Sequence, residues 1–148
     1  MNDQSAGKLF ELSILVERMM LDYYSALTEK FSHLPQIQTF WQGMADDEIE
    51  HIRELENTRK EIGPEKLSLP ASPELFEKIK TGLKFSAPDM LGQVKNLDDA
   101  YEFSHELEGR DIKRRASEGI LFIPGKISLE LLRELHVTPR AYAHIDRI

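Results

Sequence analysis

The sequence predicts an all-α fold, because helix-forming residues dominate and three long stretches carry apolar residues at helical spacing. Leu, Glu, Lys, Arg, Met and Ala are common, and runs of β-branched residues are nearly absent. Within each stretch the offsets between apolar residues alternate between three and four, which is typical of a helix that buries one face. We therefore expect a four-helix bundle with one long central connection.

The first two helices follow directly from the positions of the prolines. We expect one helix over residues 5–31, a stretch without proline. The second begins at Pro35, a residue that favours the first turn of a helix, and continues to residue 62, where Gly63 and Pro64 end it.

The long crossover between helices 2 and 3 is indicated by seven prolines and glycines between residues 63 and 92. One short helix is expected inside it, over residues 72–84. The third long helix should cover residues 96–119, with Asn96 as its N-cap and acidic residues in its first turn. A short, interrupted fourth helical region follows, at residues 128–136 and 138–148.

The composition of the chain limits the classes of function and of metal site that are expected. The 148 residues are expected to form a single domain over 1–148. The net charge of −7 argues against a nucleic-acid partner, and no apolar run is long enough to span a membrane. The first seven residues do not resemble a signal peptide, so a cytoplasmic protein is the default expectation. The chain has no cysteine, so any metal site must use Glu, Asp and His.

On each of the three long helices, the apolar residues at alternating spacings of three and four form a line along one face, which we call the apolar seam. A carboxylate interrupts the seam of every one of these helices. Glu17 lies in the middle of the first seam, Glu48 in the second with His51 one turn later, and Glu108 in the third. A buried carboxylate is costly unless something compensates its charge, and three near one level of a bundle would repel one another. A divalent cation is the simplest compensation, with iron, zinc or manganese suited to these ligands.

The Glu-x-x-His spacing is weak evidence taken alone. With 17 Glu and five His in the chain, about 0.6 such pairs are expected by chance. Two occur, Glu48 with His51 and Glu102 with His105. Only the first lies in a seam, so we interpret the second as structural.

The set of Glu17, Glu48, His51, Glu108 and His144 resembles the ligand pattern of ferritin-like di-iron carboxylate bundles, with the rubrerythrins the most similar branch. The resemblance extends over nearly the whole chain. It implies that Glu17 and Glu108 are terminal or bridging ligands, that Glu48 bridges two iron ions, and that each histidine binds one ion.

Two further residues fit the same resemblance. Tyr24 follows Glu17 by seven residues, which matches the spacing between Glu and Tyr in the family, and it would hydrogen-bond a ligand carboxylate. Asp111 follows Glu108 by one turn, where rubrerythrins often carry a second acid. The resemblance thus implies Glu17, Tyr24, Glu48 and Glu108 as the catalytic set.

The chain also departs from the family. Ala141 stands where a second Glu-x-x-His would place Glu, and Pro139 interrupts the last helix. A second ion should therefore bind more weakly than the first. Without cysteine there is no rubredoxin module, so an enzyme would need an external electron donor protein.

A purely structural bundle, with Glu–Arg pairs in place of the metal, would need inward arginines, and only Arg115 lies clearly in a seam. Two functional alternatives remain open. The first is a rubrerythrin-like peroxidase or ferroxidase, which reduces peroxide or dioxygen or oxidises ferrous iron. The second is a ferritin-like bundle with a degenerate metal site that acts as an interaction or scaffold protein without catalysis. We also expect a homodimer, because two adjacent apolar stripes in the first helix would leave apolar surface exposed beside a short fourth helix.

Overall fold

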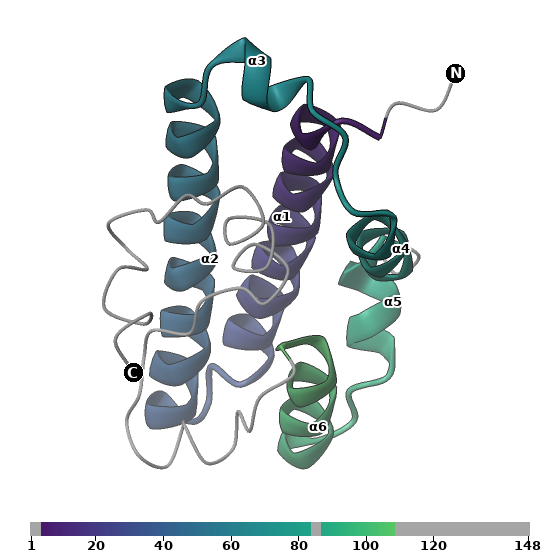
Figure 1. Cartoon of the computed structure of the whole chain (residues 1–148). Helices are drawn as coiled ribbons and strands as arrows, with labels where there is room; N and C mark the ends of the chain where they lie inside the picture. The colour runs from purple at the N-terminus through teal and green to yellow at the C-terminus, as the bar shows by residue number, and fades with distance from the viewer. Residues whose placement is uncertain (1–3, 84–86, 109–148) are drawn as a thin grey trace, which may run out of the picture.

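The computed structural model describes residues 4–83 and 87–108, which form six α-helices (Figure 1). In chain order they are α1 (Ala6–Lys30), α2 (Pro35–Glu61), α3 (Pro64–Leu67), α4 (Pro73–Gly82), α5 (Ala87–Gly92) and α6 (Leu97–Glu108). In these two stretches there is no β-strand, only one isolated bridge between Ser5 and Pro70. The all-α prediction is confirmed for the part of the chain that is described.

The predicted helices at 5–31, 35–62 and 72–84 are confirmed to within two residues at each end. The third long helix is confirmed from Leu97 to Glu108. Its expected continuation to residue 119 and the expected fourth helical region lie outside the described residues, so the four-helix arrangement stays a prediction. The short helices α3 and α5 were not predicted.

Side-chain caps fix two of the helix starts. The backbone N–H of Lys8 donates to Ser5 Oγ at 3.2 Å at the start of α1. At α6 the N–H of Asp99 donates to Asn96 Oδ1 at 2.9 Å, and the N–H of Lys95 donates to Asp99 Oδ2 at 3.0 Å. Each bond satisfies a backbone donor that a helix start leaves unpaired. The predicted Asn96 cap is confirmed.

Helices α1 and α2 form an antiparallel hairpin, side by side along most of their length (Figure 1). Each buries one face, and a large apolar side chain buried there contributes about 1.5–3 kcal/mol. The predicted seams are confirmed, since most of their residues are buried: Phe10, Ile14, Glu17, Tyr24, Thr28 and Phe31 in the first, and Trp41, Met44, Glu48, His51 and Leu55 in the second. Leu21 and Ile37 are partly buried.

The second apolar stripe of the first helix is also mostly buried within the single chain, with Leu9, Tyr23 and Leu27 fully so. The exposed apolar surface from which a homodimer was expected is therefore not found along this stripe. The homodimer itself stays a prediction.

The crossover is held against the start of α1 by backbone contacts. The N–H of Ala6 donates to the Leu69 carbonyl at 2.8 Å, and the N–H of Ala71 donates to the Gln4 carbonyl at 2.9 Å. A Cβ at Gly7 would lie 3.2 Å from the Leu67 carbonyl oxygen, so the absence of a side chain permits this close approach. From here α4 and α5 run along α1, on the side opposite α2 in Figure 1.

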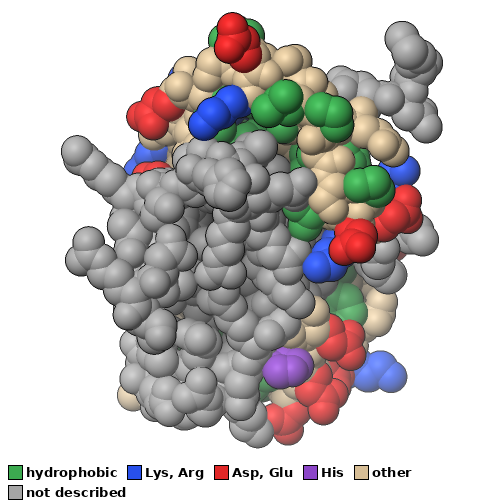
Figure 2. All heavy atoms as spheres, in the orientation of Figure 1, with side chains coloured by type: hydrophobic (Ala, Val, Ile, Leu, Met, Phe, Trp, Pro, Cys, Tyr) green, Lys and Arg blue, Asp and Glu red, His purple; other side chains and the backbone are tan. Residues whose placement is uncertain are grey.

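Six aromatic side chains connect α6 to the hairpin. Their neighbouring ring centroids lie 5.0–6.2 Å apart, in the range where aromatic pairs attract one another beyond their burial. We call this group the aromatic cluster; it comprises Tyr23, Tyr24, Phe40, Trp41, Tyr101 and Phe103. The outward face of α6 is acidic, and Figure 2 shows red side chains gathered over that end of the molecule.

Among the described residues, no helix combines the length and the apolar character that crossing a lipid bilayer requires.

The burial of Tyr23 makes stability sensitive to alkaline pH. Burial raises the pKa of the Tyr23 phenol from about 10 to about 12, with a smaller opposing effect from Ser104. Between these values the unfolded chain loses the proton while the folded chain keeps it, so the free energy of unfolding should fall as pH rises from 10 to 12. The expected loss is up to about 3 kcal/mol.

Urea unfolding of the wild type and of Tyr23→Phe across pH 8–12 measures this effect. The difference between the two pH profiles isolates the effect of Tyr23 on stability from that of the other groups. Parallel pH profiles for the two proteins would contradict the assignment.

Candidate metal centre

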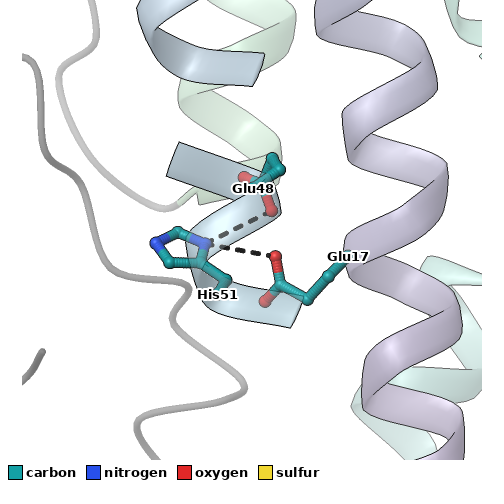
Figure 3. A network of polar contacts seen from close by, with 3 residues as sticks. All are labelled: Glu17, Glu48 and His51. Atoms are coloured by element: carbon teal, nitrogen blue, oxygen red, sulfur yellow. Dashed lines mark hydrogen bonds and ion pairs between the residues drawn. The ribbon is translucent and has the colours of Figure 1, made fainter. Parts of the chain in front are cut away.

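Three side chains meet inside the hairpin, and together they form what we call the Glu–Glu–His cluster (Figure 3). Glu17 reaches in from α1, while Glu48 and His51 come from α2. Their exposed fractions are 3%, 1% and 1%, and one ligand atom from each lies within 4.8 Å of the others. The sequence predicts all three as metal ligands, and the structure brings them together.

The local helix geometry explains the arrangement. Glu48 and His51 are three residues apart, so both project from the same face of α2. Glu17 lies at the centre of the buried face of α1. Because the helices run antiparallel, packing their apolar seams fixes the level at which Glu17 faces the α2 pair.

One imidazole nitrogen faces both carboxylates. His51 Nδ1 lies 3.3 Å from Glu48 Oε2 and 3.4 Å from Glu17 Oε2. A charge-assisted hydrogen bond between these groups is usually about 2.7–2.9 Å long. Two donors bound to one ion at about 2.1 Å each lie about 3.0–3.4 Å apart in octahedral or tetrahedral geometry. The contacts are long hydrogen bonds or ion pairs, and the same spacing is also compatible with ligands that share an ion.

The charge of the cluster favours a bound ion. Two ionised carboxylates and a protonated His51 carry a net charge of −1, and with a neutral imidazole the charge is −2. Either is costly in a site that is nearly inaccessible to water. A divalent cation beside a neutral His51 would bring the total to zero, so the donor set fits such an ion.

Tyr24, predicted to support a ligand carboxylate, is fully buried two turns beyond Glu17. Its ring stacks on Trp41, with centroids 5.9 Å apart and an interplanar angle of 15°. Trp41 precedes Glu48 by seven residues, so the two rings share one level of the hairpin, about 10 Å along the axis from the carboxylates. The proposed hydrogen bond from Tyr24 to a ligand stays a prediction.

The remaining predicted ligands are not placed beside the cluster. Glu108 is the last residue of α6, and its side chain lies outside the description. The two residues before it in the third seam, Tyr101 and Ser104, are buried as expected. Asp111 and His144 lie beyond the described residues, as does Ala141, so their roles stay predictions.

The second Glu-x-x-His pair differs from the first in burial. Glu102 and His105 both lie on the exposed face of α6, so the expectation that they do not belong to a buried site is confirmed. Position in an apolar seam, and not the spacing alone, distinguished the two pairs.

The sequence does not predict the aromatic cluster beside the site. Four of its members, Tyr23, Tyr24, Trp41 and Tyr101, lie in the predicted apolar stripes, but their grouping was not predicted. A signal was present, since Tyr24 follows Glu17 and Trp41 precedes Glu48 by the same seven residues. Because the two helices run antiparallel, a residue seven positions after Glu17 lies at the same level as a residue seven positions before Glu48. Tyr24 and Trp41 must therefore meet if Glu17 and Glu48 do.

Comparisons of the chain with models of protein families, with curated proteins and with solved structures found no match. The resemblance to ferritin-like bundles therefore rests on the residues of the sequence.

The cluster should reduce the stability of the metal-free protein. In the presence of a chelator, Glu17→Gln removes one of two facing negative charges and should raise the free energy of unfolding by about 1 kcal/mol. His51→Gln should lower it, because it leaves two carboxylates facing each other. Urea unfolding at pH 7 measures both, with the exposed Glu61→Gln as the matched control.

A large destabilisation by Glu17→Gln would show instead that the carboxylate is held as an essential ion-pair partner. That result would contradict the view of the cluster as a set of metal ligands.

Proposed function

We propose that the chain binds a divalent transition-metal ion, iron in the first place, at Glu17, Glu48 and His51, and that it supports redox chemistry on peroxide or dioxygen. The observation that carries this proposal is the position of His51 Nδ1, at 3.3 and 3.4 Å from two buried carboxylates on neighbouring helices.

The choice of ion rests on the donors. Carboxylate oxygens and an imidazole nitrogen suit iron, manganese and zinc, and the chain has no thiolate that would favour softer metals. Iron is preferred because the sequence pattern resembles the ferritin-like di-iron bundles. Glu108, Asp111 and His144 would complete a second, weaker position, with Ala141 leaving it short of one carboxylate.

The carboxylates and the imidazole of the cluster would have different roles in binding the ion. Glu17 and Glu48 supply the negative charge that retains the ion and compensates an increase in its charge. His51 must present a neutral Nδ1, so binding releases any proton held there. The buried side chains around them keep bulk water away from the site.

Bound ferrous iron would supply electrons to peroxide or dioxygen, and an external donor protein would replace them because the chain lacks cysteine-based redox groups.

The alternative is a bundle whose metal site has lost function and which acts as an interaction or scaffold protein. It predicts no metal after reconstitution, or metal without turnover. The two experiments below separate these outcomes.

Metal binding can be followed through Trp41, the single tryptophan of the chain, at about 10 Å along the hairpin from the cluster. Ferrous iron added to metal-free protein under anaerobic conditions should change the fluorescence of Trp41. The change should reach a plateau when the site is full. Glu17→Gln and Glu48→Gln should each weaken binding at least about tenfold, since even the loss of a hydrogen-bond partner of a ligand costs about 10–100-fold.

The exposed Glu61→Gln variant should bind like the wild type. Metal at 100 times its Kd should also add about 2.7 kcal/mol to the free energy of unfolding. If elemental analysis finds no iron, manganese or zinc in reconstituted protein, the proposed site is wrong.

Redox activity has a separate test. Iron-loaded protein should consume hydrogen peroxide faster than the same concentration of free ferrous iron, by about tenfold or more, which corresponds to about 1.4 kcal/mol of activation free energy. Glu48→Gln should lose this advantage and Glu61→Gln should keep it. Peroxide consumption is measured by stopped flow with a chemical reductant present.

A wild type that binds iron tightly but consumes peroxide no faster than free iron would leave metal binding in place. It would refute the redox function and favour the scaffold alternative.

A further inference from the structure

A polar pocket lies where the last turn of α1 meets the first half of α2, and it shares no residue with the Glu–Glu–His cluster. Its volume is about 470 Å³, which is within the usual range of small-molecule binding sites. Most of the residues around it are exposed or partly exposed, so the pocket is open to solvent. The lining comprises Thr28 from α1 and, from α2, Gln38, Thr39, Gln42, Gly43 and Asp46.

The two hydroxyl groups of the pocket already donate to the backbone. Thr28 Oγ1 donates to the Tyr24 carbonyl at 2.8 Å, and Thr39 Oγ1 donates to the Pro35 carbonyl at 2.9 Å. A hydroxyl has one hydrogen to donate and two lone pairs that accept. Toward a ligand, both threonines therefore act as hydrogen-bond acceptors.

The rest of the lining adds further acceptors and one negative charge. Gln42 Nε2 donates to Asp46 Oδ1 at 3.0 Å, which orients the carboxylate. Asp46 keeps a second oxygen, and the amide oxygens of Gln38 and Gln42 also accept. None of the described residues that line the pocket is basic. All five side chains thus present an acceptor oxygen, and only the two glutamine amides retain hydrogens to donate.

We propose that this pocket binds an alkylguanidinium group, carried either by a small molecule or by an arginine side chain of a partner protein. A guanidinium has a positive charge and five N–H donors in one plane, whereas an ammonium has three donors. The larger number of donors suits a lining of acceptors around one carboxylate, and the weaker hydration of a guanidinium favours its binding in a pocket open to water. The alkyl chain would lie along Gly43, which contributes backbone alone to the lining. This binding does not depend on a metal ion, so it can hold or fail independently of the proposed function.

Titration of the full-length protein, followed by two-dimensional NMR of its amide groups, is the direct test. The probes are N-acetylarginine amide, N-acetyllysine amide with an ammonium, and N-acetylcitrulline amide, in which a neutral urea group replaces the guanidinium. The arginine compound should shift the signals of the Gly43 N–H and of the Gln38 and Gln42 side-chain amides, and the shifts should reach a plateau at millimolar concentration. The lysine compound should bind more weakly, and the citrulline compound most weakly, because it lacks the charge. If either binds as tightly as the arginine compound, the proposal is wrong.

Charge variants provide a second test. Asp46→Asn should weaken binding of the arginine compound about two- to fivefold, which corresponds to the contribution of an exposed ion pair. Gln42→Glu should strengthen it, because it adds a second carboxylate to the pocket. Asp22→Asn removes an exposed carboxylate that does not line the pocket, so this matched control should bind like the wild type. Equal affinities for the wild type, Asp46→Asn and Gln42→Glu would overturn the proposal.

Two further probes distinguish the sources of the guanidinium group. Butylguanidinium carries the head group and an alkyl chain without a peptide backbone, and a blocked pentapeptide with one arginine among glycines represents a partner protein. Equal affinities would assign the pocket to a small molecule, and tighter binding of the peptide would assign it to a protein partner. If neither probe saturates the pocket, the proposal fails.

Discussion

The meeting of two buried carboxylates with one imidazole nitrogen is the interaction on which the rest of the structure depends. Glu17 and Glu48 cannot both be ionised in a site this dry unless a positive charge accompanies them. His51 compensates at most one of the two. A divalent cation bound by the three side chains is one way to compensate the remaining negative charge.

The antiparallel hairpin surrounds the cluster with apolar contacts, which stabilise the helices that carry the charged side chains. The same register that sets Glu17 against Glu48 also stacks Tyr24 on Trp41, two turns away. Through Tyr101, the aromatic cluster attaches α6 to that level of the hairpin. Favourable packing of the aromatic rings thus offsets the unfavourable free energy of burying charge two helical turns away.

Most of this arrangement could be predicted from the sequence, because it depends on periodicity. The bounds of α1 and α2 follow from Pro35, Gly63 and Pro64, and the inward position of Glu17 and Glu48 follows from their place in apolar seams. The Asn96 cap was also predictable, since a capping side chain acts within one turn of its own helix.

What the sequence could not provide depends on contacts between distant segments. The pairing of Gln4 and Ala6 with the crossover joins residues more than 60 positions apart, and no local pattern encodes it. The short helices α3 and α5 lie among prolines and glycines, where periodicity is lost. The choice of Nδ1 as the nitrogen that faces both carboxylates depends on the side-chain rotamer of His51, which spacing does not determine.

Anomalous diffraction at the iron absorption edge, from crystals grown with ferrous iron, tests the central claim most directly. The account predicts a peak within about 2.2 Å of His51 Nδ1 and of one oxygen each from Glu17 and Glu48. The contradicting result is a crystal grown with excess iron that shows no peak between the two helices and has the three side chains bonded only to one another.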